Sequence, residues 1–235
     1  MKKSLAQDVL ADNRNTYNLI AEKFSNTRNR QWPTIERLAE KYVTAKNKIL
    51  DVGCGNGRLY DLLQGKDVDY LGIDSSDNLI KLAGATGGRF IVKDILDLDF
   101  GQEFDVVFAI AVINHLPNKD LRLKTLGNIF AALKKDGYLI MTNWNLWRLS
   151  IRQKTVWKYL LRGKAKKQKG SFRDVVTYFH DQDSEYPLYY YAFTLYELKK
   201  LVRRAGFKVV EAYYEKNGKK SWWGAGNNLV LVCQK

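Results

Sequence analysis

The segment Asp51–Gly57 restricts the fold of this chain more than any other part of its 235 residues. It reads Asp-Val-Gly-Cys-Gly-Asn-Gly and directly follows the apolar run Lys48–Leu50. Glycines on alternate positions let a backbone turn sharply at the end of a strand and approach a ligand where a side chain would not fit. The segment therefore predicts a strand that ends in a tight, ligand-binding turn.

The rest of the chain alternates apolar strand patterns with helical patterns. This alternation predicts parallel strands joined by right-handed crossovers, with helices on both faces of one sheet. Asp136-Gly137 ends one helix, and the capping box Thr194–Glu197 begins another. We expect an α/β fold with strands at 48–53, 69–74, 89–93, 105–110, 137–143, 207–214 and 227–233, and helices at 5–24, 32–42, 57–64, 76–84, 119–134 and 194–205.

A strong positive charge is the second constraint. The chain carries 39 Lys and Arg against 25 Asp and Glu, which gives a formal net charge of +14 and a pI near 9.6. Such an excess attracts polyanions in a salt-dependent way, and nucleic acid is the leading candidate partner. A merely soluble basic surface and attraction to anionic lipid are the alternatives. Ten basic residues lie between Arg148 and Arg173, a stretch without any acidic residue.

The composition excludes several classes of protein. The two cysteines, Cys54 and Cys233, and the two histidines, His115 and His180, are too few and too dispersed for a metal cluster or a disulfide framework. The sequence contains no apolar run as long as a membrane helix, and lysines follow Met1 at once. We therefore expect a cytoplasmic protein with no metal and no membrane span.

Asp74, at the end of the second predicted strand, adds a chemical requirement to the glycine turn. A carboxylate there can accept hydrogen bonds from both hydroxyls of a ribose. The GxGxG spacing differs from the GxGxxG of dinucleotide sites, and no Lys-Ser/Thr follows to hold a triphosphate. For the glycines alone, an ordinary glycine-rich turn is the alternative. Together, Asp51–Gly57 and Asp74 resemble motif I of the class I methyltransferases, which bind S-adenosylmethionine.

The resemblance implies a Rossmann-like, mostly parallel seven-stranded sheet with a C-terminal antiparallel hairpin. Asp51 would orient the glycine turn or the cofactor ammonium, and Asp74 would hold the ribose. Asp94 is the candidate acceptor for the adenine amino group, with Asp97 and Asp99 as alternatives. The predicted cofactor residues are Asp51, Gly53, Gly55, Gly57, Asp74, Ser75, Asp94, Ile95 and Ala109.

Two reaction types are disfavoured by the residues themselves. Methylation of a pyrimidine at carbon 5 needs a cysteine nucleophile, but Cys54 belongs to the glycine turn and Cys233 to the last predicted strand. The loop after the fourth strand also lacks the Asp/Asn-Pro-Pro-aromatic signature of many adenine-N6 methyltransferases. An oxygen or another nitrogen therefore remains as the methyl acceptor.

A longer set of motifs resembles the tRNA carboxymethyluridine methyltransferases, which act on the wobble uridine. The stretch Tyr17–Pro33 is similar to that family's Y-N-x-I-A-x-x-F-S-x-T-R-x-x-x-W-P pattern. Asn114 and Tyr191 stand where the family tends to carry histidines, and Leu188 stands where an arginine is usual, so the exact acceptor stays open between carboxymethyl and carboxymethoxy uridine. The other similar elements are Asp51–Gly57, Asp74–Ser76, Ile110–His115, Tyr189–Phe193, Tyr214–Lys216 and Trp222-Trp223.

This resemblance implies one methyltransferase domain, with tRNA as the substrate and the anticodon loop as its binding region. Its parts would be a helical lid at 1–46, a cofactor-binding core at 47–144, a basic insertion at 145–190, and a helix with a β-hairpin at 191–235. Eukaryotic members work with a small zinc-binding partner protein, so an activating partner is also considered for this chain.

The family reaction also implies roles for polar residues near the acceptor. A carboxymethyl group is ionised at neutral pH and needs no general base, so positioning would supply most of the catalysis. Arg28 would orient the carboxylate and His115 would help to position the acceptor; a surface cation and a packing histidine are the alternatives. The predicted RNA- or substrate-binding residues are Arg30, Asn114, Trp144, Arg148, Arg152, Lys158, Lys164, Lys166, Lys167, Tyr189 and Tyr190.

Two other functions are compatible with the sequence. A small-molecule O- or N-methyltransferase with a basic surface would carry the same cofactor motifs. A noncatalytic RNA-binding protein would keep the fold, although intact Asp51, Asp74 and glycines argue against it. For the aromatic residues, packing in the core is the alternative to stacking on bases, and for Trp147–Leu161 an amphipathic membrane-surface helix is a less favoured one.

Overall fold

An eight-stranded sheet forms the centre of the computed structural model, which describes residues 3–27, 32–148, 171–181 and 184–235. The strands lie in the order β3-β2-β1-β4-β5-β10-β8-β9. The first five strands pair in parallel, whereas β10 is antiparallel to both of its neighbours. The strands are β1 (Lys48–Val52), β2 (Asp69–Asp74), β3 (Arg89–Val92), β4 (Phe104–Ile110), β5 (Leu133–Trp144), β8 (Lys208–Lys216), β9 (Lys219–Ser221) and β10 (Asn228–Gln234).

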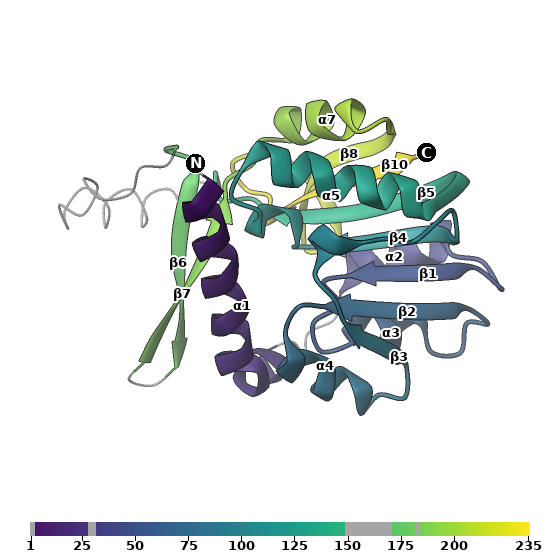
Figure 1. Cartoon of the computed structure of the whole chain (residues 1–235). Helices are drawn as coiled ribbons and strands as arrows, with labels where there is room; N and C mark the ends of the chain where they lie inside the picture. The colour runs from purple at the N-terminus through teal and green to yellow at the C-terminus, as the bar shows by residue number, and fades with distance from the viewer. Residues whose placement is uncertain (1–2, 28–31, 149–170, 182–183) are drawn as a thin grey trace.

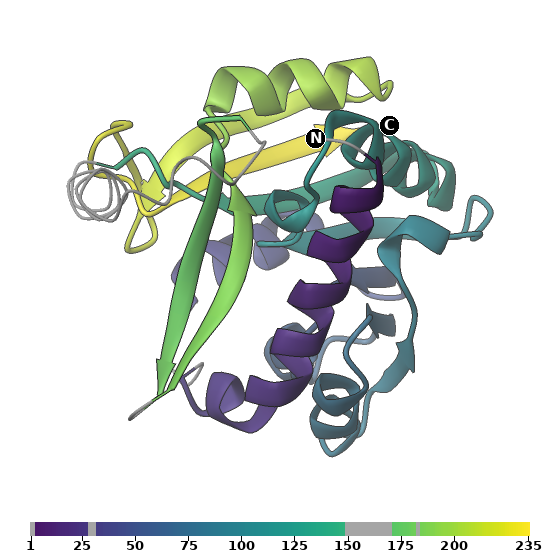
Figure 2. The same ribbon diagram turned by 60° about the vertical axis from the view of Figure 1, so that its left-hand side comes forward.

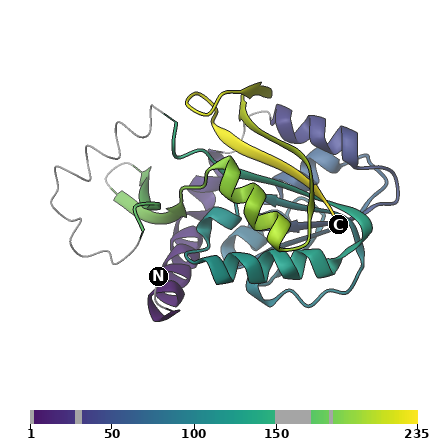
Figure 3. The same cartoon turned by 90° about the horizontal axis from the view of Figure 1, so that it is seen from above.

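Helices cover both faces of this sheet, as Figure 3 shows from above. One core packs α5 and α7 against the sheet through residues such as Ile129 and Val202, and the other packs α2 and α3 through Leu38 and Leu63. The helices are α1 (Lys3–Asn26), α2 (Pro33–Tyr42), α3 (Arg58–Leu63), α4 (Asp77–Gly84), α5 (Lys119–Ala132) and α7 (Leu195–Arg204), with short 3-10 turns η1 (Ile95–Asp97) and η2 (Ile113–His115).

The predicted strands and helices are all present, within a few residues at their ends. The predicted α/β sheet with a C-terminal antiparallel pair is confirmed, because β10 lies between β5 and β8. The strand count of seven was one too low, since β9 adds an eighth strand by pairing with β8.

A second, two-stranded sheet was not predicted from the sequence. β6 (Asp174–Asp181) and β7 (Ser184–Tyr191) form an antiparallel hairpin inside the region predicted as a basic insertion. Figure 1 shows this hairpin standing apart from the central sheet, beyond the carboxyl ends of the parallel strands.

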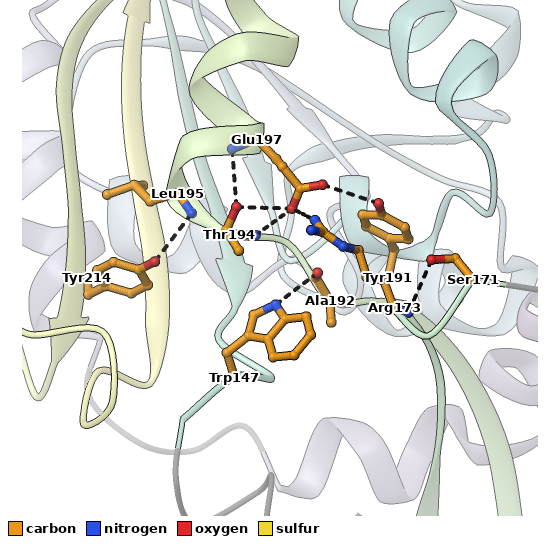
Figure 4. A network of polar contacts seen from close by, with 9 residues as sticks. All are labelled: Trp147, Ser171, Arg173, Tyr191, Ala192, Thr194, Leu195, Glu197 and Tyr214. Atoms are coloured by element: carbon orange, nitrogen blue, oxygen red, sulfur yellow. Dashed lines mark hydrogen bonds and ion pairs between the residues drawn. The ribbon is translucent and has the colours of Figure 1, made fainter. Parts of the chain in front are cut away.

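The base of the hairpin is fixed to α7 by a polar network, drawn in Figure 4. Glu197 completes the capping box of α7 with Thr194 and also forms an ion pair with Arg173. The Tyr191 hydroxyl donates to Glu197 Oε1 at 3.4 Å, and Trp147 Nε1 donates to the Ala192 carbonyl at 3.0 Å. One helix cap therefore anchors both the hairpin and the chain that follows β5.

Helix α1 lies between the hairpin and α4, as Figures 1 and 2 show. On one side, Asn18 Oδ1 accepts hydrogen bonds from the Ser76 hydroxyl at 2.6 Å and from the Asn78 backbone at 3.2 Å. On the other side, the Thr16 hydroxyl donates to the Pro187 carbonyl at 3.1 Å, and Lys23 forms an ion pair with Asp181. Helix α1 thus closes the region beyond the strand ends from two sides.

Candidate active site

A cleft of about 1070 Å³ lies where the parallel strands end. Its walls come from the glycine turn after β1, helix α1, the η2 turn, the end of β5 and the start of β10. A cleft at this edge is where open α/β sheets bind their ligands. Among the predicted site residues, it is lined by Asp51, Gly53, Gly55, Asp74, Ser75, Asp94, Ile95, His115, Trp144, Arg148 and Tyr190.

The glycine turn is held against β2 by backbone hydrogen bonds. The N–H groups of Gly53 and Cys54 both donate to the Ile73 carbonyl, at 2.8 and 2.9 Å. Gly53 has a φ of 71°, and a Cβ added there would overlap the Val112 side chain. The turn therefore needs glycine at 53 for both its backbone angle and its close approach to the segment after β4.

Alanine substitutions at Gly53 and Gly55 should separate the cost of the backbone angle from the cost of the close approach. Gly55 also has a positive φ, 56°, but no atom lies within 4 Å of its added Cβ. We expect Gly55→Ala to lower the free energy of unfolding by about 1 kcal/mol and Gly53→Ala by about 2 kcal/mol, the difference being the clash. Urea unfolding measures both, and Val112→Ala should recover the difference in the Gly53 variant alone. Equal losses at the two glycines would contradict the close approach.

Asp74 joins the turn to the end of β2. Its Oδ2 accepts from the Gly55 N–H at 3.0 Å, and its Oδ1 accepts from the Ser76 N–H at 2.9 Å. Burial raises the pKa of Asp74 above its ordinary value, while these backbone donors oppose the shift. Each oxygen keeps a lone pair for a further donor in the cleft, which is the capacity that two ribose hydroxyls require.

Asp51 lies at the floor of the cleft and is almost fully buried. The Tyr70 hydroxyl donates to its Oδ2 at 2.8 Å. Burial raises the pKa of Asp51 to about 7, against the opposing effect of the Tyr70 hydrogen bond. The group therefore titrates near neutral pH, so a nearby cation would favour its charged form.

The predicted adenine end of the cleft contains Asp94 and Ile95. The Asp94 Oδ1 accepts from the Leu96 N–H at 2.9 Å and caps η1, which fixes the carboxylate at the cleft wall. The two alternative acids do not line the cleft: Asp99 forms an ion pair with Lys93 at 2.8 Å, and Asp97 lies near Lys124.

His115 is held in one orientation by contacts from two elements, α1 and β7. Its Nδ1–H donates to the Tyr189 carbonyl at 3.0 Å, which leaves Nε2 to accept from the Tyr17 hydroxyl at 3.1 Å. The Tyr190 ring lies 4.5 Å away, centroid to centroid. Burial lowers the pKa of His115 to about 4, so the imidazole is neutral at neutral pH. It is a fixed hydrogen-bonding group rather than a cation.

The end of the cleft away from Asp94 and Ile95, called the acceptor end below, is lined by aromatic residues and a cation. Trp144 stacks on Tyr190 with a centroid distance of 5.4 Å and an interplanar angle of 22°. Arg148 Nη1 donates to Asn227 Oδ1 at 2.5 Å, while its buried Nε has no hydrogen-bond partner within the described residues. This part of the cleft therefore combines a stacked aromatic pair with a guanidinium group.

Four of the predicted site residues do not line the cleft: Gly57, Ala109, Asn114 and Tyr189. Ala109 is fully buried in the core, because the inward face of β4 packs under α5. Gly57 faces Phe90 and Ala83 at the start of α3. Asn114 is fully buried in η2 and Tyr189 is buried with its hydroxyl on Asp174, and none of the four lines the cleft. Tyr189 contributes through its backbone carbonyl only, as the acceptor for His115.

Other predictions lie outside the described residues and are neither supported nor contradicted by the structure. These are Arg28, Arg30, Arg152, Lys158, Lys164, Lys166 and Lys167.

Sequence reasoning missed a group of polar residues at the acceptor end. Glu215 is buried and lines the cleft, accepting from Gly218 N–H at 2.6 Å and Asn228 Nδ2 at 2.8 Å. Asn145 and Asn227 line the same end. The Tyr214–Lys216 motif marked this region, but a role in the cleft depends on β10 lying between β5 and β8, which no local pattern specifies.

The described residues show no other obvious chemical centre. Cys54 and Cys233 are both free and buried, and burial raises the pKa of each thiol, which agrees with their exclusion as nucleophiles. Within the described ranges, no three His, Cys, Asp or Glu side chains gather as metal ligands. No described helix combines the length and apolar character needed to cross a bilayer.

Comparison with known proteins identifies the family of this chain. A family profile described as "Methyltransferase domain" matches residues 22–212. The chain belongs to this family. It is an S-adenosylmethionine-dependent methyltransferase, and S-adenosylmethionine is the cofactor that the residues of the cleft suit. Asp51 near the end of β1, Asp74 at the end of β2 and Asp94 after β3 offer acceptors of the kind that the ammonium, ribose and adenine groups of that nucleoside need, and their individual roles stay predictions.

Several curated relatives of this methyltransferase carry the name tRNA (carboxymethyluridine(34)-5-O)-methyltransferase, and two of them illustrate the similarity. The protein from Schizosaccharomyces pombe is 27% identical over 216 residues, covering 88% of this chain and 92% of that protein. The protein from Arabidopsis thaliana is 33% identical over 129 residues, which are 54% of this chain and only 31% of that protein's length.

A solved structure shows the same fold at lower identity. It is a putative methyltransferase of Haloferax volcanii in complex with the Trm112 methyltransferase activator, with a TM-score of 0.67 and 17% identity, covering 94% of this chain and 96% of that one. The two chains therefore share the Rossmann-like methyltransferase fold.

Proposed function

We propose that this methyltransferase transfers a methyl group to the carboxylate of a carboxymethyl-type uridine at the wobble position of tRNA, forming a methyl ester. The observation that carries the proposal is the acceptor end of the cleft, where Arg148 and the stacked pair Trp144 and Tyr190 line the same cleft as the predicted cofactor residues. A guanidinium matches a carboxylate, and an indole face matches a nucleobase. The names of the two relatives and the net charge of +14 support the same substrate.

Positioning is the main task of this chain in the proposed reaction. When bound, S-adenosylmethionine supplies an electrophilic methyl group. The acceptor carboxylate is ionised at neutral pH, so no side chain has to remove a proton. Arg148 orients the carboxylate, and Arg28, which lies outside the described residues, is the second candidate for this role, while neutral His115 fixes Tyr17 at the cleft wall. Holding the reacting groups in line is worth several kcal/mol of the barrier, roughly 7–11 in favourable cases.

The direct test is mass spectrometry of nucleosides from tRNA treated with the enzyme and S-adenosylmethionine. The proposal expects loss of the free carboxymethyl-type uridine and appearance of a nucleoside heavier by one methyl group. Methyl transfer to a metabolite, with none to tRNA, would instead identify a small-molecule methyltransferase.

Asp51 provides a pH-dependent prediction for cofactor binding. We assign the cofactor ammonium to its carboxylate, and the pKa of about 7 means that this carboxyl is largely protonated below neutral pH. Binding must then release the proton, so affinity should fall as the pH falls. Between pH 7.0 and 5.5 we expect affinity for S-adenosylhomocysteine to weaken about tenfold, measured by calorimetry. Asp51→Asn should flatten most of this slope, and a wild-type affinity that is flat over the same interval would contradict the assignment.

A small activating partner protein belongs to the proposal as well. Strand β3 lies at one edge of the sheet, and its Ile91 and Val92 are exposed. An exposed apolar edge strand accepts an added strand from another protein. Addition of a Trm112-like protein should therefore raise the turnover of the enzyme. A turnover that does not change on this addition would contradict the proposed partner.

A further inference from the structure

Two adjacent tryptophans, Trp222 and Trp223, are exposed beside the cleft. Their side chains are 55% and 47% exposed, and neither belongs to the buried core. They lie in the loop between β9 and β10. Tryptophan is usually highly buried, so a neighbouring pair left in solvent points to a binding surface.

The loop that carries the pair is held by hydrogen bonds. The Trp222 carbonyl accepts from the N–H groups of Ala225 and Gly226, at 3.2 and 3.0 Å. The Trp223 carbonyl accepts from Nδ2 of the fully buried Asn145 at 2.6 Å. The two indole rings pack edge to face, with centroids 5.6 Å apart. A ligand that stacks on these rings therefore loses little free energy to ordering the loop.

The position of the loop connects it with the acceptor end of the cleft. Asn145, which holds the Trp223 carbonyl, lines the cleft itself. The same loop continues into Asn227, which lines the cleft and accepts from Arg148. Strand β10 then begins at Asn228, opposite Trp144. A nucleic acid strand with one base in the acceptor end would have its neighbouring nucleotides near this loop.

The charge around the pair favours a polyanion. Lys216, Lys219 and Lys220 are exposed, and the stretch from Lys216 to Trp223 contains no acidic residue. Indole faces combined with lysines are typical of surfaces that bind unpaired nucleotides, because bases stack on the rings while phosphates meet the cations. A paired duplex hides its base faces and would not use such a surface.

We propose that Trp222 and Trp223, with Lys219 and Lys220, form a stacking platform for the unpaired RNA nucleotides that flank the methylated uridine. The inference rests on the proposed tRNA substrate and adds a second RNA contact outside the cleft. It accounts for an exposed aromatic pair on a fixed loop, which neither the core nor cofactor binding requires.

The test compares RNA affinity of Trp→Ser and Trp→Phe variants at 222 and 223. The probes are a stem-loop RNA with a seven-nucleotide unpaired loop and a fully paired duplex of equal length, measured by fluorescence anisotropy. We expect each Trp→Ser change to weaken stem-loop binding about tenfold and each Trp→Phe change only about twofold, because a phenyl ring still stacks. Duplex binding and affinity for S-adenosylhomocysteine should not change.

Tyr196→Ser is the matched control, since Tyr196 is an aromatic residue 74% exposed on α7. It should leave stem-loop binding unchanged. Lys219→Gln with Lys220→Gln should lower the salt dependence of binding, whereas the tryptophan variants should keep it. A double Trp→Ser variant that folds and binds the stem-loop like the wild type would overturn the platform and assign the pair to a protein partner. If the wild type itself methylates no tRNA, the proposed function fails instead.

Discussion

Replacing Asp74 by alanine should weaken S-adenosylhomocysteine binding about a thousandfold. The carboxylate accepts from Gly55 and Ser76 N–H groups, so its removal leaves both donors without their partner and frees the glycine turn. It also removes the proposed acceptor for the two ribose hydroxyls of the cofactor. Hydrogen bonds to a charged group contribute about 1.5–3 kcal/mol each, which makes a loss of this size the expected one.

Asp74→Asn should be nearly as harmful as Asp74→Ala, although it keeps the shape of the side chain. Each carboxylate oxygen faces a backbone N–H, so the amide NH₂ of an asparagine would meet a donor at one of the two positions. Calorimetry of both variants measures the effect. Asp77→Ala, at an exposed position at the start of α4, should bind like the wild type. An Asp74→Asn variant within about threefold of wild-type affinity would contradict the role of the carboxylate.

The position of the glycine turn, Asp74 and Asp94 in one cleft could be predicted from the sequence because it follows from local patterns. A glycine turn after one strand and an acid after the next must meet at the same edge when the strands are parallel neighbours, and β1 and β2 are such neighbours. Asp94 follows the same logic after β3. These predictions needed only the positions of strand ends, which the apolar runs mark clearly.

The acceptor half was predicted less well because it depends on tertiary packing. Asn114 and Tyr189 carry suitable chemistry, but the short η2 turn and the hairpin rotate both side chains into the protein. The β6–β7 hairpin itself was missed, since its strands pack on α1 and on the chain after β5 rather than in the main sheet. Glu215 and Asn227 reach the cleft only because β10 is inserted between β5 and β8.

Arg148 is one of the basic residues predicted to bind RNA or substrate, for which a phosphate contact is the ordinary role, but its geometry favours a different one. It lines the cleft beside Trp144, and Asn227 holds its Nη1 while the buried Nε has no partner among the described residues. A half-buried guanidinium whose Nε lacks a partner gains from an anion bound beside it in the cleft. We therefore expect it to orient the acceptor carboxylate.

Arg148→Ala should lower kcat by about 10²–10³ while the KM for tRNA and the affinity for S-adenosylhomocysteine change little, because the loss falls on positioning in the reacting complex. Arg148→Lys should recover only part of the activity, since an ammonium lacks the fork that matches a carboxylate. Added guanidinium ion should partly rescue the alanine variant but not the lysine variant.

The phosphate role predicts the opposite pattern, so the two can be separated in one set of measurements. Loss of a phosphate contact would raise KM, leave kcat intact and reduce the slope of log affinity against log salt by about 0.7–0.9. Arg204→Ala, at the exposed end of α7, is the matched control and should leave kcat, KM and the salt slope at wild-type values. A reduced slope with full turnover in Arg148→Ala would assign the side chain to the RNA backbone, and the carboxylate would then need another cation, for which Arg28→Ala is the next variant to measure.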